Sequence, residues 1–557
     1  MKRIIILAAL AMPAAVQAQN FNPTVEVTNT YEGRLLDIQK PMQVMPVPDS
    51  VTKFDMKFDY SVFEKPYSGS YDFQPYLINM KPQTMRENAK TFYFLAGAGY
   101  VLRPVVHAVF SPDMSRDDIH VNIYARHDSY FGDYADISNI SSWFPAGSKF
   151  SGYDAYTKAG VDGEYSFGRS ALGWDVHYTG IHSKDWIDTY GFNSISSSLG
   201  LRSVKRGVID YAARFGFTHS SDRGVSDVRE NILSFSGSFG PEFSRTSKIL
   251  VDADLTYYSQ RGATLTRGLG VISIVPHFVF TNNRWTFDLG ARITSHFAES
   301  ELNYVRKPQL AYPDAKIRYT LVDGKVTLYA NVGGGERINT ITSLKEGDRF
   351  IGISMLPGEE LNNSIERIRL TAGIRGNISE RFGYDAFAGY SIISDKLLYS
   401  MKDRKEGDVV YVKSRPSYGL YNDVVMFAGL RAGWHSRTVD VNGEVVFQRS
   451  DIRKSPEDMA AFLPSALTAS LTAAYVWNER LGLTVGAAFA SERKLDDPMS
   501  MDRLPSWLDL QAKLEYRLTH KLSLWASGTN LLSQPVYRTP MHTVTAPSVT
   551  AGFCLNF

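Results

Sequence analysis

The feature that most constrains this chain is an alternation of apolar and polar residues that recurs along most of its length. In residues 508–518 every second side chain is apolar, and the residues between them are charged or carry an amide. Similar alternation occupies residues 481–489, 285–293 and 119–125. Successive residues of a β-strand face opposite sides of a sheet, whereas helical spacing would spread these charges around every side. The sequence therefore predicts an all-β protein.

These strands are predicted to cross a membrane rather than to form a soluble sandwich. Each runs about 9 to 13 residues, which is longer than a sandwich strand and sufficient to cross a hydrocarbon layer at a tilt. The face opposite the apolar one carries ionised groups in mid-strand, such as Asp252, Asp254, Arg369 and Arg375. After residue 18, no apolar run approaches the ~18 to 20 residues that a spanning helix needs. The pattern indicates a transmembrane β-barrel and excludes a helical membrane protein.

The connections between strands alternate in length, which allows the strands to be counted. Short turns are predicted at 168–170, 282–283, 323–324, 436–437, 478–479 and 519–520, and longer connections at 449–463, 490–506 and 531–545. Short periplasmic turns with longer outer loops are typical of outer-membrane barrels. Both ends of such a barrel are periplasmic, so the number of strands must be even. Residues 409–421, which are polar and contain Pro416, are assigned to an outer loop, and about 22 antiparallel strands remain.

The first residues predict export. In residues 1–18, Lys2 and Arg3 precede an apolar run, and the small residues before Gln19 predict signal-peptide cleavage after Ala18. The chain has 60 basic and 58 acidic residues, so removal of Lys2 and Arg3 leaves 58 of each sign. A neutral protein has no bulk charge with which to bind nucleic acid. The predicted location is the outer membrane of a Gram-negative cell, where the 13% of aromatic residues would enrich both interfaces.

The last strand carries a predicted assembly signal. Every second residue at the C-terminus is apolar, namely Val549, Ala551, Phe553, Leu555 and Phe557. A terminal strand that finishes in phenylalanine resembles the signal that the outer-membrane assembly machinery recognises. The alternative is an ordinary closing strand of a soluble domain.

A 22-stranded barrel with such a last strand resembles the barrel of the TonB-dependent outer-membrane receptors, particularly those of Bacteroidota. The resemblance covers residues 93–557, and the final hairpin, 522–532 followed by 551–553, is similar to the closing pattern of that family. It implies transport of a solute across the outer membrane. The segment 19–92 is shorter than the full plug domain that fills the lumen of those receptors, so the predicted barrel lacks a full plug.

Two stretches of the extended segment 19–92 are candidate interaction sites. Near its start, Thr24, Val25, Glu26, Val27 and Thr28 resemble a TonB box, the short strand that such receptors add to the edge of the energising protein. A plain extended segment is the alternative. Further on, aromatic residues interrupted by prolines predict a chain that lies against the barrel lumen or a partner. These residues are Phe58, Tyr60, Phe63, Tyr67, Tyr71, Phe73 and Tyr76.

The sequence predicts no catalytic, cofactor-binding or metal-binding residues. The 11 histidines are scattered, none is paired with glutamate at helical spacing, and there is no G-x-S-x-G motif. The only cysteine is Cys554, which excludes an intrachain disulfide. The protein is therefore not expected to be an enzyme.

An open barrel of this size would breach the permeability barrier, so something is expected to fill it. The candidates are outer loops at 128–154 and 335–362, the segment 19–92, or another protein. Inward charges of both signs, such as Arg292 and Asp254, predict cross-strand pairs rather than an ion-selective filter. Solute transport is the first functional prediction, and the alternatives are a scaffold that anchors periplasmic or surface proteins and a passive porin. The expected partners are outer-membrane lipid, the assembly machinery, and TonB or another periplasmic protein.

Overall fold

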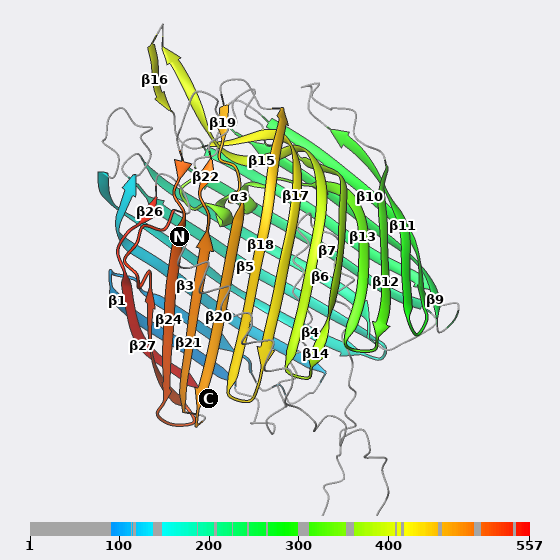
Figure 1. Ribbon diagram of the computed structural model, residues 1–557, viewed down its shortest axis with the longest axis horizontal. Coiled ribbons are helices and arrows are strands. Elements are labelled where there is room, and N and C mark those ends of the chain that lie inside the picture. Colours follow the sequence, from blue (N-terminus) through cyan, green and yellow to red (C-terminus); the bar gives the residue numbers. More distant parts are fainter. Residues whose placement is uncertain are drawn as a thin grey trace, which may run out of the picture. The chain divides into compact units, whose positions relative to one another are not determined.

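The computed structural model describes residues 91–557, with gaps, and these belong to one compact unit, Pro66–Phe557. The gaps are residues 113, 115–117, 137–147, 186–187, 205–208, 225–226, 242–243, 245, 263–265, 299–310, 352–360, 362, 407–408, 414–416, 455–458, 479, 495–502 and 538–541. The described chain forms an antiparallel β-barrel in which consecutive wall strands are neighbours (Figure 1). No helix among the described residues is long and apolar enough to cross a membrane.

Within the part of the chain that the structure describes, 22 strands form the closed wall, which confirms the predicted fold class and strand number. They are β1 (Phe92–Tyr100), β2 (Val105–Phe110), β3 (Ile119–Asp136), β4 (Ser148–Phe167), β5 (Ser170–Lys184), β6 (Thr189–Ser203), β7 (Ile209–Arg223), β8 (Asp227–Pro241), β9 (Ser247–Arg261), β10 (Thr266–Thr281), β11 (Trp285–Ala298), β12 (Ala311–Val322), β13 (Val326–Arg337), β14 (Ser364–Ser379), β15 (Phe382–Glu406), β17 (Ser417–His435), β18 (Val439–Lys454), β20 (Leu467–Trp477), β21 (Leu481–Ala490), β24 (Trp507–Arg517), β25 (Leu522–Thr529) and β27 (Ser548–Asn556).

The connections contain short elements of their own. These are the helix α3 (Ile341–Gly347) and the strands β16 (Val409–Lys413), β19 (Met459–Ala461), β22 (Arg493–Lys494), β23 (Arg503–Leu504) and β26 (Thr543–Val544). β16 pairs with the far end of β15, in agreement with the prediction of an outer loop there. Residues from Ser417 onward belong instead to the wall strand β17, so the assignment of all of 409–421 to a loop is wrong. The β pairing of this stretch with β15 prevails over its polar composition.

The barrel closes where β1 pairs with β27, and glycines permit the close approach of these strands. Gly552 of β27 lies opposite Gly97 of β1. A Cβ atom at Gly552 would lie 1.9 Å from the carbonyl oxygen of Ala96, and one at Gly97 would lie 2.4 Å from the ring of Trp525. Neither position has room for a side chain, which explains the small residues in two otherwise apolar strands.

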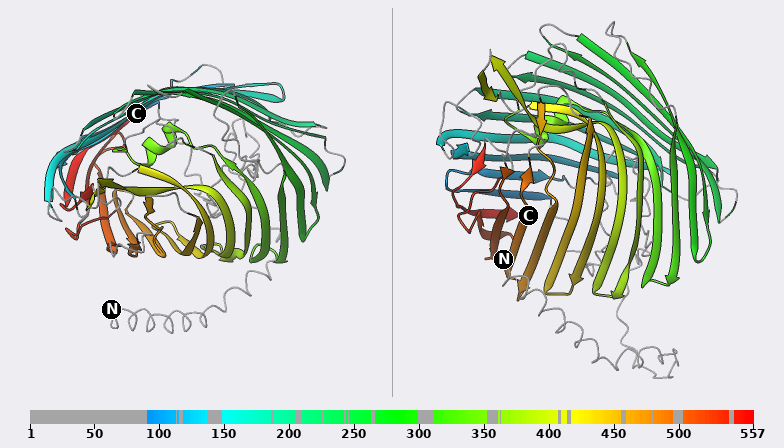
Figure 2. Two further views of the ribbon diagram at one scale, coloured as in Figure 1. Left: turned by 90° about the horizontal axis from the view of Figure 1, so that it is seen from above. Right: turned by 45° about the horizontal axis from the view of Figure 1, so that its top comes forward.

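The wall has an apolar outer face and a polar inner face. Figure 2 shows α3 inside the ring of strands, and α3 packs on Phe192 of β6 and Val228 of β8. Residues of the opposite parity on these strands, such as Ile195 and Leu233, therefore face outward, and both are exposed. Large apolar residues are exposed in this way on strands all around the wall, and together we call them the apolar belt. Such a belt is typical of a lipid-facing surface.

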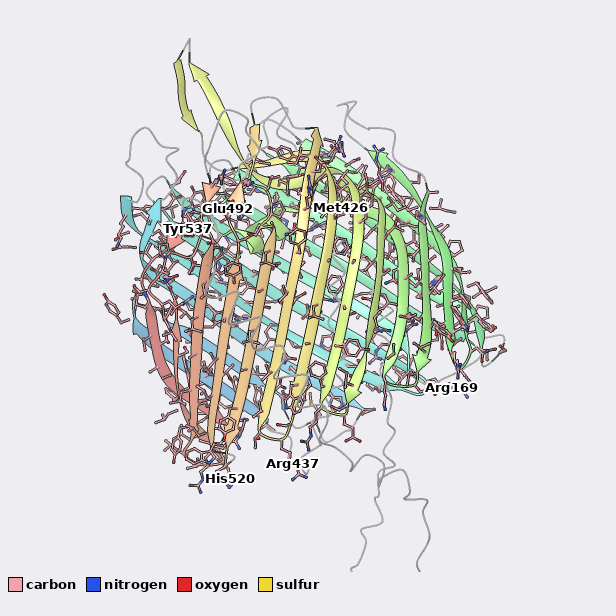
Figure 3. All side chains as sticks on the ribbon, viewed as in Figure 1. Arg169, Met426, Arg437, Glu492, His520 and Tyr537 are labelled. Atoms are coloured by element: carbon pink, nitrogen blue, oxygen red, sulfur yellow. The ribbon has the colours of Figure 1, made fainter. Side chains whose placement is uncertain are left out.

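The short turns and the long connections lie at opposite ends of the barrel. In Figure 3, Arg437 and His520 mark the end with short turns, and Glu492 and Tyr537 mark the end with long connections. The predicted short turns are confirmed, because β17 to β18 and β24 to β25 are joined by only a few residues. One expectation is wrong: β5 to β6, β7 to β8 and β9 to β10 are also joined by short connections at the outer end. The outer connections are therefore short along this part of the wall.

Candidate functional site

The connection between β13 and β14 folds into the lumen and forms the candidate functional site. Its described residues, 338–351, 361 and 363, include α3, and we call 338–351 the inner loop. Thr340 caps α3, because its hydroxyl accepts a hydrogen bond from the amide of Ser343 at 3.1 Å. The Ser343 hydroxyl interacts in turn with the backbone of Thr340. This reciprocal cap stabilises a helix of only seven residues.

An apolar surface fixes the inner loop to one side of the lumen. Ile341 and Leu344 of α3 pack against Ile181, Phe192 and Val228, which lie on β5, β6 and β8. These side chains are almost completely buried. Removal of such apolar surfaces from water stabilises the docked position of the loop. The inner loop is therefore a packed structural element.

A buried ion pair reinforces this packing. Nζ of Lys345 lies 2.8 Å from the carboxylate of Asp222 on β7, and both side chains are fully buried. The same ammonium group donates a hydrogen bond to the carbonyl oxygen of Ile351 at 2.5 Å. It also lies 5.4 Å from the centre of the Tyr190 ring on β6. Lys345 therefore ties the helix both to the barrel wall and to the chain that follows it.

A second carboxylate holds the start of α3. Both oxygens of Glu230, on β8, accept a hydrogen bond from the amide of Ile341 at 3.2 Å. The side-chain amide of Gln260, on β9, donates to the same carboxylate at 2.7 Å. Amides in the first turn of a helix have no partner within the helix, so Glu230 satisfies one of them.

The far end of the inner loop reaches β3, β4 and β5. Arg349 pairs with Asp154 at 2.9 Å, and its carbonyl oxygen accepts a hydrogen bond from Ser183 at 2.7 Å. Phe350 stacks on the ring of His542, with ring centres 3.9 Å apart. His542 belongs to the connection between β25 and β27, so two outer connections meet inside the upper lumen.

The end of the connection that returns to β14 is also anchored. Arg267 of β10 donates a hydrogen bond to the carbonyl oxygen of Leu361 at 2.6 Å. The hydroxyl of Tyr258, on β9, donates to the side chain of Asn363 at 3.1 Å. The connection therefore contacts the inner wall from β3 to β10, although it begins and ends at β13 and β14.

Charges elsewhere on the inner wall are paired across strands, in agreement with the prediction of balanced charges. His277 of β10 lies between Asp288 of β11, at 2.8 Å, and Asp252 of β9, at 3.1 Å. Arg292 lies 3.5 Å from Asp254. Further round the wall, Arg431 of β17 pairs with Glu444 of β18 at 2.8 Å. These pairs place charges of both signs side by side on the inner wall.

The residues predicted from the sequence are placed unequally. Of the predicted assembly signal, Val549, Ala551, Phe553 and Phe557 are exposed and Leu555 is half-buried. The alternation places the first four residues of the signal on one face of β27, and Phe557 follows the last residue of that strand. The TonB-box-like residues 24–28 and the aromatic residues of 58–76 lie outside the described residues. The candidate filler 335–362 does enter the lumen in its described part. Among the described residues, no group of three or more His, Cys, Asp or Glu is arranged to hold a metal ion.

Sequence reasoning did not find the residues that hold the inner loop. Asp222, Glu230 and Asp154 were available as charged residues of inward parity, close to the outer ends of their strands. Their partners Lys345 and Arg349 lie in a connection with no strand periodicity. The alternation along each strand could have shown that these acidic residues face the lumen. It could not have shown that they contact Lys345 and Arg349.

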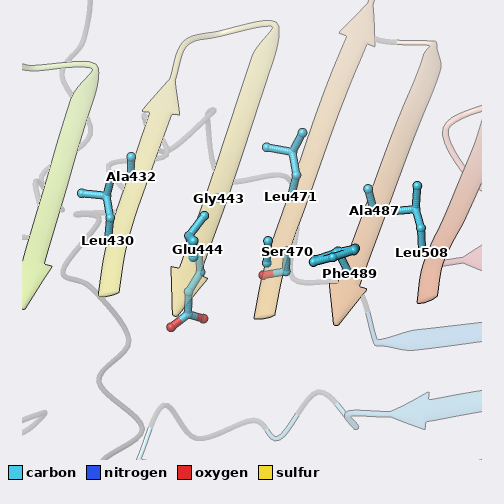
Figure 4. A pocket seen from close by; sticks show the side chains of 11 residues that line it. Leu430, Ala432, Gly443, Glu444, Ser470, Leu471, Ala487, Phe489 and Leu508 are labelled. Carbon is cyan, nitrogen blue, oxygen red and sulfur yellow. The ribbon is translucent and has the colours of Figure 1, made fainter. Parts of the chain in front are cut away.

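An apolar groove on the wall offers no alternative site. It lies over β17, β18, β20, β21 and β24 and is lined mainly by Leu, Ala, Val and Phe (Figure 4). Leu430, Val445 and Leu471 belong to its lining and to the apolar belt. The groove is therefore part of the lipid-facing surface.

Comparison with known proteins relates the barrel to a class of solved structures. No protein-family model and no curated protein matches the sequence. The structure is similar to the FrpB iron transporter from Neisseria meningitidis, with 9% identity, a TM-score of 0.62, and coverage of 84% of this chain and 81% of that chain. The ferric-catecholate import receptor Fiu from E. coli K12 has 10% identity and a TM-score of 0.60, with coverage of 84% of this chain and 82% of that chain. The copper transporter OprC has 12% identity and a TM-score of 0.60, with coverage of 84% of this chain and 80% of that chain. The barrel has the fold of TonB-dependent outer-membrane receptors. This confirms the resemblance at the level of the fold.

Proposed function

We propose that this protein is an outer-membrane transport protein of the TonB-dependent-receptor type, which moves a solute through a lumen narrowed by the inner loop. The size of the barrel carries the proposal. Barrels of 16 to 18 strands already leave an aqueous channel, whereas 22-stranded outer-membrane transporters have a filled lumen. The inner loop, which is packed and ion-paired against the inner wall, is one such filling element.

The solved structures with this fold favour transport over a purely structural role. Their names describe transporters or import receptors of iron, ferric catecholate and copper. Metal complexes of these kinds are therefore the first solutes to test. The paired charges of the inner wall suit passage of a solute without selection by net charge.

Two parts of the proposal concern residues 19–92. We propose that Thr24–Thr28 adds a strand to the edge of TonB, and that the aromatic stretch Phe58–Tyr76 lies against the inner wall. The aromatic stretch is too apolar to remain in water and too short to bury a core of its own. Residues 549–557 serve assembly in the same proposal.

Uptake by cells tests the transport function directly. Cells that express the full chain should accumulate a labelled ferric catecholate, ferric ion or copper complex faster than cells without it. A Val25→Pro variant should lose this uptake and the binding of purified TonB, because proline removes a backbone donor from the added strand. Asn20→Pro, outside the box, is the matched control. Uptake that Val25→Pro leaves intact would remove TonB from the proposal, whereas no uptake of any solute would favour the anchoring alternative.

A further inference from the structure

An outward-facing cluster of arginines lies at the outer ends of three wall strands, where the outer connections are short. Its members are at or near the outer ends of β7, β8 and β9, and all three are exposed: Arg223, Arg229 and Arg261. Their neighbours in sequence face the lumen, since Asp222 pairs with Lys345 and Glu230 bonds to Gln260. Adjacent residues of a strand face opposite sides, so the three arginines point away from the lumen.

The pairing of the strands brings two of these charges together. Arg229 of β8 lies directly opposite Arg261 of β9 in the antiparallel register. Side chains at such positions begin only about 5 Å apart, and like charges there repel each other. Neither arginine forms an ion pair with another described residue. Arg223 lies opposite Asp227, an exposed acidic residue next to the cluster.

The cluster lies immediately above the apolar belt. On the outer face of β8, Arg229 is followed by Asn231 and then by the exposed Leu233. On β7, Phe217 lies opposite Leu233 and is exposed as well. Arg229 is thus two outward positions above Leu233, and Arg223 is three outward positions above Phe217. We expect the membrane to change from hydrocarbon to headgroups at this level. The connections 224–226 and 262–265 are too short to place a long outer loop over the arginines.

We propose that Arg229, Arg261 and Arg223 bind the phosphate group of an outer-leaflet lipid whose acyl chains lie on Phe217 and Leu233. The planar guanidinium group donates two parallel hydrogen bonds to phosphate oxygens, and one anion between two arginines removes their mutual repulsion. The apolar belt directly below selects a lipid headgroup over free phosphate, because only the lipid gains contacts with both surfaces. This inference concerns the outer wall and is independent of the proposed transport function.

Native mass spectrometry of the purified barrel in detergent tests the proposal, with bis-phosphorylated lipid A as the probe. The intact protein should retain one lipid per barrel, and Arg229→Gln with Arg261→Gln should weaken binding at least about tenfold. The matched control is Arg449→Gln with Arg453→Gln. These two exposed arginines lie on the outer face of β18, and Arg453 is already paired with Asp451 at 2.8 Å. Heat-modifiable gel mobility establishes that each variant is folded.

Three outcomes would overturn the proposal. Equal loss of lipid in both double variants would mean that the charge of the rim binds lipid without a specific site. Equal retention of lipid A and of its dephosphorylated form would exclude phosphate recognition. Displacement of the bound lipid by millimolar inorganic phosphate alone would show an anion site that does not require the acyl chains.

Discussion

Lys345 of the lumenal helix and Asp222 of β7 form a completely buried ion pair, with Nζ 2.8 Å from the carboxylate. Lys345 belongs to an outer connection and Asp222 belongs to a strand of the wall. The pair therefore fastens the inner loop to the fixed wall of the barrel. Removal of one partner from a buried pair is costly, because the remaining charge is left without compensation. The position of the inner loop should therefore depend on this contact more than on any exposed pair.

The first prediction is that Lys345→Met releases the inner loop. The substitution leaves Asp222 buried and uncompensated, which should destabilise the docked loop by about 3 to 5 kcal/mol. Planar-bilayer recordings should show larger or more frequent open events than the unsubstituted protein, and a protease added on the outer side should cleave the loop faster. Arg202→Met is the control, since Arg202 pairs with Glu164 at 3.0 Å in an exposed position on β6.

A compensating variant separates charge from packing. Lys345→Met combined with Asp222→Leu removes both charges, and replacement of a buried pair by apolar residues is often neutral. Closure of the lumen should therefore return. A double variant as open as the single one would mean that the loop is lost through packing, and the ion pair would have no special role.

The second prediction concerns which face of β24 meets lipid. Leu514 faces outward and is 44% exposed, whereas the carboxylate of Glu515 accepts a hydrogen bond from Ser523 at 3.0 Å. Leu514→Arg should cost about 2 to 4 kcal/mol near the bilayer midplane, while Glu515→Gln retains an acceptor and should have little effect. Folding into bilayers, followed by heat-modifiable gel mobility, measures both. Equal sensitivity at the two positions would contradict the assignment of the faces.

The period-two pattern predicted most of the wall because its cause is local. Leu514 and Glu515 are neighbours in sequence, so they lie on opposite faces of their strand. A strand with one face toward lipid and the other toward a wet lumen must alternate apolar and polar residues in this way. The strand count followed from the same rule with the requirement that the number be even. The short outer connections were missed because the polar residues at the ends of β7 and β8 are as typical of a loop as of a strand that rises above the membrane.

The sequence identified the connection 335–362 only as one candidate to fill the lumen. Its contacts could not be predicted, because they join residues that are far apart in the sequence. Glu230 and Ile341 are 111 positions apart, and neither carries a motif that identifies the other. A helix of seven residues with a reciprocal cap leaves little trace in a strand-rich sequence. What the size of the barrel did predict was the need for a filling element.

The third prediction is that the β1–β27 seam tolerates no side chain at Gly552. A Cβ atom there would meet a carbonyl oxygen at 1.9 Å, a backbone contact that no rotamer relieves. Gly552→Ala should therefore reduce the fraction of folded, heat-modifiable barrel. Gly482→Ala, where the nearest atom would lie at 3.9 Å, is the matched control in another wall strand. Equal folding of the two variants would show that the seam is looser than this contact implies.

The fourth prediction tests whether the aromatic stretch also fills the lumen. The inner loop contacts the wall from β3 to β10, and its described residues have no contact with β18, β20 or β21 among the described interactions. The connection between β25 and β27 meets the inner loop at His542, and we expect the aromatic stretch to be a further filling element. Replacement of residues 54–82 by a Gly/Ser linker of equal length should produce a large, stable conductance in planar bilayers, while the intact protein stays nearly closed.

Combination of that replacement with Lys345→Met distinguishes the roles of the two elements. If each closes a different part of the lumen, the combined variant should conduct more than either single variant, because their effects on separate parts of the pore add. An intact protein that already conducts freely would be a porin, and residues 54–82 would then have no occluding role. A replacement that leaves conductance low but releases a co-purifying protein would assign the stretch to partner binding, because the apolar surface that it carries would have been buried against that partner instead of the wall.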